Sequence, residues 1–87
     1  MALTRADFLR LLPFAVGHAP FRIDGEEIAS DGNSPAWRIH LRERPARAFG
    51  PVGIPVLAVT LRLEGATEAH AREFVAHFLL GFQRAGG

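Results

Sequence analysis

The most distinctive pattern of chemically active side chains lies in the segment "AWRIHLRER". Arg38, His40 and Arg42 occupy alternate positions there, and apolar residues separate them. Because successive side chains of a strand point to opposite faces, a strand here would present all three from one face. Arg62 has the same phase in the later segment "VLAVTLRLEG". Guanidinium groups bind phosphates and carboxylates through paired hydrogen bonds, so we expect these four residues to bind an anionic ligand or a partner.

A solvated face is the alternative interpretation of the same residues. Charges opposite an apolar face are typical of a half-buried sheet, and these could pair with Asp24, Glu43 or Glu64. Nucleic acid is the less favoured anionic partner, because Trp37 has the phase of the core and leaves the outer face without an aromatic ring for base stacking. We therefore expect a protein partner or an anionic ligand.

The second of these segments also suggests self-association. Val56 and Ala58 share the outward phase of Arg62, so part of that face is apolar and small-sided. Leu80 falls on the polar side of the last predicted helix. Because a small domain can enlarge its core by pairing with a copy of itself, we expect a homodimer with Val56, Ala58 and Leu80 in the interface.

A second group of chemically active residues, His70, Glu73 and His77, follows helical spacing in "HAREFVAH". The three side chains would face the same way on a helix, as metal ligands must. However, the two histidines are seven residues apart instead of about four, the spacing that a shared ion prefers, and no cysteine supports the site. We expect no metal here and interpret the residues as an exposed helix face.

The composition limits catalysis further. The chain has no cysteine and its ten basic residues are all arginine, which excludes disulfides, thiol nucleophiles and Schiff-base lysines. Ser30 and Ser34 lie in a loop segment without a nucleophile motif, and the acidic residues fall in turns, caps and exposed positions. We expect a non-enzyme without catalytic residues or a cofactor. The net charge of +1 does not by itself indicate nucleic acid.

The length and hydropathy of the chain predict one domain spanning residues 1–87. Eighty-seven residues suffice for one hydrophobic core, and 48% hydrophobic residues argue against disorder. No apolar run approaches the roughly 18 residues that a membrane helix needs. The segment "MALTRADFLR" lacks the pattern of a secretory signal, so we expect a cytoplasmic protein without a membrane partner.

Two helices and three or four strands must position these residues. A helix is expected from Thr4, a hydroxyl cap, to about Leu12, where Pro13 should end or kink it. Strands are expected at residues 21–23, near Ile28, and in the two alternating segments. Their order predicts an α+β domain, α-β-β(-β)-α, in which an antiparallel three-stranded meander carries both helices on one face. The segment "PARAFGPVGIP" should form a loop or an irregular edge, because proline interrupts strand pairing.

The last helix should run from about Thr67 to about Gln83. Its core-facing stripe contains Ala71, Phe74, Val75, Phe78 and Phe82, with Leu79 at the edge. The corresponding sheet face contains Trp37, Ile39, Leu41, Leu57, Val59, Leu61 and Leu63.

Two limited resemblances complete the sequence analysis. An α-β-β-β-α order resembles that of double-stranded RNA-binding domains, but "ATEAHAREF" lacks the lysine-rich helix start through which those domains contact phosphate. The terminal Gly86-Gly87 resembles the tail of ubiquitin-like and sulfur-carrier proteins, in which the last glycine is activated. Those carriers reach the tail from a strand, whereas this chain should reach it from a helix. A carrier and a nucleic-acid-binding domain are therefore the alternative functions.

Overall fold

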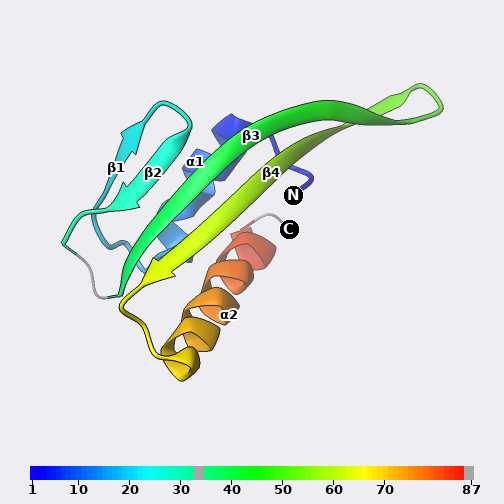
Figure 1. The fold of residues 1–87 in the computed structure, drawn as a ribbon. Coiled ribbons are helices and arrows are strands. Elements are labelled where there is room, and N and C mark those ends of the chain that lie inside the picture. Colours follow the sequence, from blue (N-terminus) through cyan, green and yellow to red (C-terminus); the bar gives the residue numbers. More distant parts are fainter. Residues whose placement is uncertain (33–34, 86–87) are drawn as a thin grey trace.

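Two helices pack side by side on one face of a four-stranded antiparallel sheet (Figure 1). The computed structural model describes residues 1–32 and 35–85, and it confirms the expected small α+β domain. The elements, in chain order, are α1 (Arg5–Ala15), β1 (Phe21–Asp24), β2 (Glu27–Ser30), β3 (Ala36–Phe49), β4 (Val52–Glu64) and α2 (Glu68–Ala85). The strands are neighbours in the order β1-β2-β3-β4, so the sheet has one strand more than the expected three-stranded meander, because residues 27–30 pair as a strand of their own.

Both helices begin at a threonine that caps free backbone amides. The Thr4 hydroxyl accepts a hydrogen bond from the Asp7 amide at 3.1 Å, and the Thr67 hydroxyl accepts one from the His70 amide at 3.2 Å. Pro13 lies inside α1, which continues to Ala15. None of the helices in the described part of the chain is long and apolar enough to cross a membrane.

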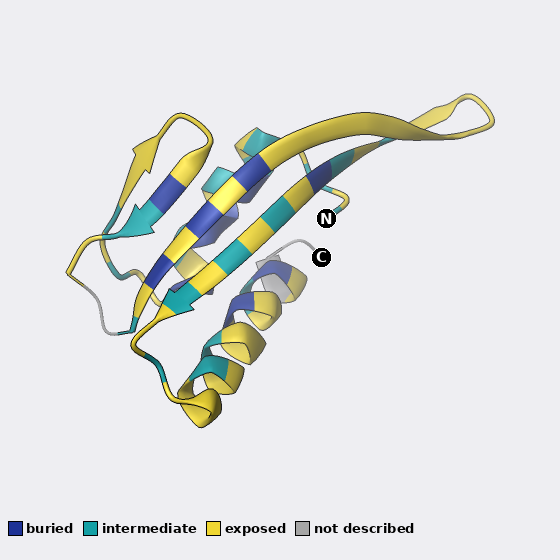
Figure 2. Ribbon diagram, in the orientation of Figure 1, coloured by how far each residue is buried: buried dark blue, intermediate teal, exposed yellow. Residues whose placement is uncertain are grey.

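Alternation along β3 separates the core from the outer face. Trp37, Ile39 and Leu41 are buried, and the residues between them are exposed (Figure 2). Aromatic rings from both helices complete the core, with Phe8 of α1 stacked on Phe82 of α2 at a centroid distance of 4.8 Å. The buried set is Phe8, Leu11, Leu12, Ala15, Val16, Ile28, Trp37, Ile39, Leu41, Leu57, Phe78 and Phe82.

The β4 side of the core is less complete than the sequence predicted. Val59, Leu61 and Leu63 are only partly buried, although they share the inward phase of the buried Leu57. Val75 of α2 was expected in the core, but 38% of its surface is exposed. The core therefore centres on α1, β2 and β3 and thins toward β4.

The proline-rich segment of residues 45–55 is not the expected loop, because it forms the end of β3 and the start of β4. β3 and β4 instead continue as a two-stranded hairpin, here called the arm (residues 44–56), which extends away from the helices (Figure 1). The ladder shifts register between the Arg44–Val56 and Arg47–Ile54 pairs. Pro45 and Pro55 lie at this bulge, where the ladder is already interrupted, so their missing amides cost little.

The two helices make their closest approach where Gly81 of α2 meets Ala15 of α1. A β-carbon on Gly81 would lie 2.6 Å from the Ala15 Cα and 3.0 Å from its Cβ. Both partners belong to, or lie next to, the backbone and cannot rotate away. Glycine is therefore needed for this crossing.

We predict that Gly81→Ala destabilises the protein in spite of the better helix propensity of alanine. Alanine should gain about 1 kcal/mol as a helix former, but forcing the helices apart costs about 1–3 kcal/mol. Chemical denaturation measures the net change in the free energy of unfolding. Ala76→Gly, at an exposed position of α2, calibrates the propensity contribution. A Gly81→Ala protein stabilised by as much as Ala76→Gly is destabilised would contradict the close crossing.

Candidate anion-binding face

The register of β3 and β4 brings the predicted arginines together on the outer sheet face. Arg38 lies directly opposite Arg62, and His40 lies directly opposite Thr60. Arg42 is opposite Ala58 one step further toward the arm. Directly paired residues on neighbouring antiparallel strands have Cα atoms about 5 Å apart, so Arg38 and Arg62 form a like-charge cross-strand pair.

A third arginine joins this pair through the hairpin of β1 and β2. Arg22 is opposite Ala29, and Ala29 is opposite Arg38. One line across all four strands therefore carries Arg22, Ala29, Arg38 and Arg62; its three arginines are here called the cationic row. The sequence analysis missed Arg22. The alternation of Phe21, Arg22 and Ile23 indicates that Arg22 points to the outer face. Only the hairpin register shows that it is aligned with Arg38.

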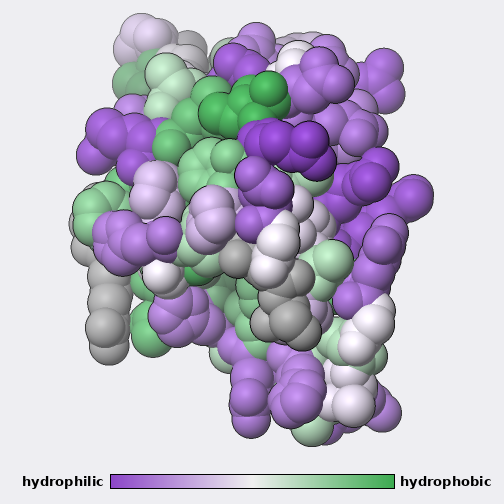
Figure 3. Space-filling model, turned by 90° about the vertical axis from the view of Figure 1, so that its left-hand side faces the viewer, coloured by the Kyte–Doolittle hydropathy of each residue, from purple (hydrophilic) through white to green (hydrophobic). Residues whose placement is uncertain are grey.

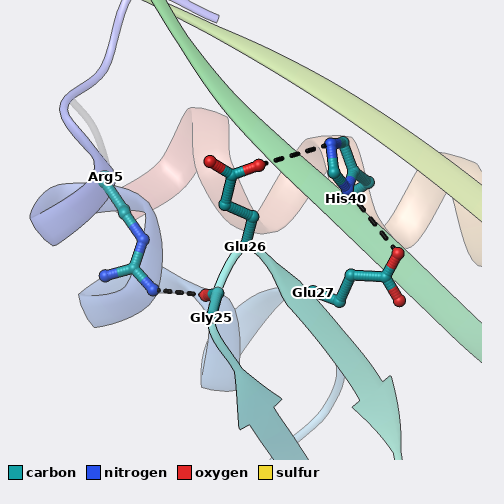
Figure 4. Close-up of polar contacts among 5 residues, drawn as sticks. All are labelled: Arg5, Gly25, Glu26, Glu27 and His40. Carbon is teal, nitrogen blue, oxygen red and sulfur yellow. Dashed lines mark hydrogen bonds and ion pairs between the residues drawn. The ribbon is translucent and has the colours of Figure 1, made fainter.

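The next line toward the arm carries the opposite charge. Asp24, Glu27 and His40 are neighbours across β1, β2 and β3. The His40 ring lies between two carboxylates, with Nε2 3.7 Å from Glu26 Oε2 and Nδ1 3.7 Å from Glu27 Oε1 (Figure 4). A protonated His40 would form two ion pairs there. Glu27, Arg38, His40, Thr60 and Arg62 line a shallow open depression between the two lines.

The position of Glu26 is set by its neighbours in the turn before β2. Its carbonyl accepts a hydrogen bond from the Leu41 amide at 2.8 Å. The Arg5 guanidinium of α1 donates to the carbonyl of the adjacent Gly25 at 2.7 Å (Figure 4). These contacts tie the turn to both α1 and β3, so the carboxylates beside His40 come from a braced segment.

The cationic row differs from His40 in having no carboxylate partner among the described residues. Within residues 1–32 and 35–85, the side-chain ion pairs are Asp7–Arg10, Glu26–His40, Glu27–His40 and Glu68–Arg72. The expected alternative, pairing of the outer arginines with Asp24, Glu43 or Glu64, does not occur among these residues. Arg38 and Arg62 thus repel each other across one strand spacing.

An anion between Arg38 and Arg62 would relieve this repulsion. Each guanidinium offers a planar pair of donors that matches a phosphate or a carboxylate. Arg22 lies two strand spacings, about 10 Å, from Arg38, so it could hold a second anionic group of an extended ligand. The arrangement can therefore bind and orient anions.

The other residues predicted from sequence lie elsewhere. Val56 and Ala58 project from the outer face of β4, whereas Leu80 lies on α2, which covers the other face. His77 Nδ1 is 3.2 Å from the Ala15 carbonyl oxygen, so this ring contacts α1. Gly86 and Gly87, the proposed carrier tail, lie outside the described residues.

We predict that Arg62→Glu stabilises the protein at low ionic strength. The change replaces a like-charge cross-strand pair with an attractive one, a difference of about 0.5–1 kcal/mol in the free energy of unfolding. At 1 M salt, where the screening length is about 3 Å, the gain should largely disappear. Arg44→Glu, opposite Val56 on the arm, makes the same charge change without a facing arginine. Equal stabilisation by both variants would show that net charge, and not the pair, is responsible.

Comparison with known proteins does not add a family to this description. The chain matches no protein-family model, no curated protein and no solved structure.

Proposed function

We propose that the protein is a small cytoplasmic, non-enzymatic interaction module that acts as a homodimer and binds an anionic group of a partner on its outer sheet face. The observation that carries the proposal is the direct opposition of Arg38 and Arg62 without a carboxylate partner in the described residues. Such a pair is unfavourable until an anion bridges it.

Neighbouring residues define what this site would accept. Ala29 stands between Arg22 and Arg38, so a ligand can lie against the sheet across the cationic row. The carboxylates beside His40 form a negative border that would repel an anion placed one line further toward the arm. The preferred ligand is therefore one or two phosphate or carboxylate groups aligned across the strands.

A protein or a small acidic ligand fits this surface better than nucleic acid. Trp37 is buried beneath the sheet, so the described outer face offers no aromatic ring on which a base could stack. A nucleic-acid backbone would also extend over the acidic line of Asp24 and Glu27. Binding of double-stranded RNA is the outcome that would favour the alternative.

We expect inorganic phosphate, titrated at low salt, to shift the NMR resonances of the Arg38 and Arg62 side chains. The combination Arg38→Ala with Arg62→Ala should weaken binding about 100-fold or more, because each arginine loses at least one charge-assisted hydrogen bond of about 1.5–3 kcal/mol. Arg42→Ala with Arg62→Ala should have a smaller effect, since Arg42 lies beyond His40. Raising the salt concentration should weaken binding in parallel.

The matched control is Arg44→Ala with Arg47→Ala, which removes two positive charges from the arm. This variant should bind phosphate almost as well as the unmodified chain. Equal losses in the control and in the Arg38/Arg62 variant would mean that only net charge matters. Absence of binding to phosphate and to a dicarboxylate at low salt would rule out the anion site.

A further inference from the structure

The free edge of β4 presents a row of backbone groups that can accept another strand. Met1 already pairs with this edge at Leu57. The Leu57 amide donates to the Met1 carbonyl at 2.7 Å, and the Met1 amino group donates to the Leu57 carbonyl at 2.6 Å. Both polar groups of Leu57 therefore point away from β3. Because the register from Ala36–Glu64 to Arg44–Val56 has no bulge, Val59, Leu61 and Leu63 point their amides and carbonyls the same way.

An apolar groove runs beside this edge, between β4 and α2. Its volume is about 510 Å³, and it is here called the β4–α2 groove. Val75 and Leu79 of α2 form one wall and are 38% and 48% exposed. Leu57, Val59, Leu61 and Leu63 of β4 form the other wall. Val59, Leu61 and Leu63 thus offer apolar side chains toward the helix and, at the edge, backbone groups that no other described strand pairs with.

The opposite edge of the sheet is built differently. β1 has four residues and carries Arg22 and Asp24, while β4 has thirteen. Figure 3 views the molecule from the β1 side and shows hydrophilic side chains around a hydrophobic area. A short, charged edge strand discourages strand addition, whereas the body of β4 from Leu57 to Glu64 contains no proline. The β1 edge is thus protected against strand addition and the β4 edge is not, as expected if a partner strand covers β4 alone.

The exposed area is larger than a monomer of this size should have. A monomeric protein of 9.5 kDa is expected to expose about 5,050 Å², but this chain exposes 5936 Å². Its radius of gyration of 13.7 Å likewise exceeds the roughly 12 Å expected for 87 residues. The excess is about 900 Å², and the projecting arm and the open β4–α2 groove are both exposed surfaces of the chain.

We propose that a second copy of the chain covers this side by pairing β4 with β4 in antiparallel orientation about a two-fold axis at Leu61. Val59 of each copy would face Leu63 of the other, so all three edge-directed residues would be hydrogen-bonded. This register places Arg62 opposite Thr60 of the second copy. A shift that centred the axis on residue 62 would place two Arg62 side chains directly opposite, which is unfavourable.

The size of the surface agrees with a dimer. Eight strand residues at about 3.3 Å each and two layers about 20 Å deep give roughly 500 Å² per copy, or about 1,000 Å² in total, the lower range of specific interfaces. A lone peptide strand could also pair with β4. It would bring no helix against Val75 and Leu79, whereas the second α2 would approach both across the axis. This inference specifies the homodimer of the proposed function and does not depend on the anion site.

Analytical ultracentrifugation over a concentration series tests the proposal. The unmodified chain should dimerise, and the amides of Val59, Leu61 and Leu63 should exchange with solvent more slowly as the dimer forms. Val59→Pro removes an edge-directed amide without removing a hydrogen bond to β3. Since the loss occurs twice by symmetry, we expect a dimer dissociation constant about 100-fold higher or more. Circular dichroism checks that the variant folds.

A second variant tests the groove without changing the backbone. Val75→Glu with Leu79→Glu, at positions already exposed in a single copy, should yield a folded monomer. The matched control, Val56→Glu with Leu80→Glu, adds the same charge at two residues of the dimer face expected from sequence, and it should remain dimeric. Disruption by the control alone would overturn the β4 interface, as would a chain that is monomeric at all concentrations. Phosphate titration of each variant separates this result from failure of the anion site.

Discussion

The antiparallel pairing of β3 with β4 is the constraint on which the other features of this protein depend. Its regular register extends from Ala36–Glu64 to Arg44–Val56. Because side chains alternate between the two faces of both strands, this register places Trp37 and Leu57 in the core and Arg38 beside Arg62 on the outer face. A shift of β4 by one residue would turn Arg62 toward the core and Leu61 and Leu63 toward solvent, so hydrophobic burial and formation of the cationic row specify the same register.

The two helices divide the inner face unequally. α1 contributes Phe8, Leu11 and Leu12 to the centre of the core, whereas α2 leaves Val75 and Leu79 exposed. The edge of β4 is open at the same place, and an antiparallel dimer would complete both layers there. Such a dimer would also set two cationic rows on one face of a continuous sheet. The proposed interface lies at an edge and the anion site on a face, so the two can operate together.

The sequence alone predicted an α+β domain with a helix at each end, the Thr4 cap and the faces of the two long strands, because these follow from local periodicity and from a side chain that bonds to a nearby amide. It failed at the arm. Proline was taken as a strand breaker, but Pro45 and Pro55 coincide with a bulge whose position depends on the pairing of two distant segments. The place of Arg22 in the cationic row was not predicted for a similar reason, since only the hairpin register aligns it with Arg38.

By itself, the sequence determined which side chains share a strand face: alternation placed Arg38, His40 and Arg42 opposite the apolar residues, whatever the neighbouring strands. The tertiary structure decided which of them meet. Register set Arg38 against Arg62, while the turn before β2 brought Glu26 and Glu27 to His40 and left the row uncompensated. It also decided that β4, and not β1, is the long open edge. Periodicity is a property of one segment, but contacts between strands depend on how separate segments are aligned.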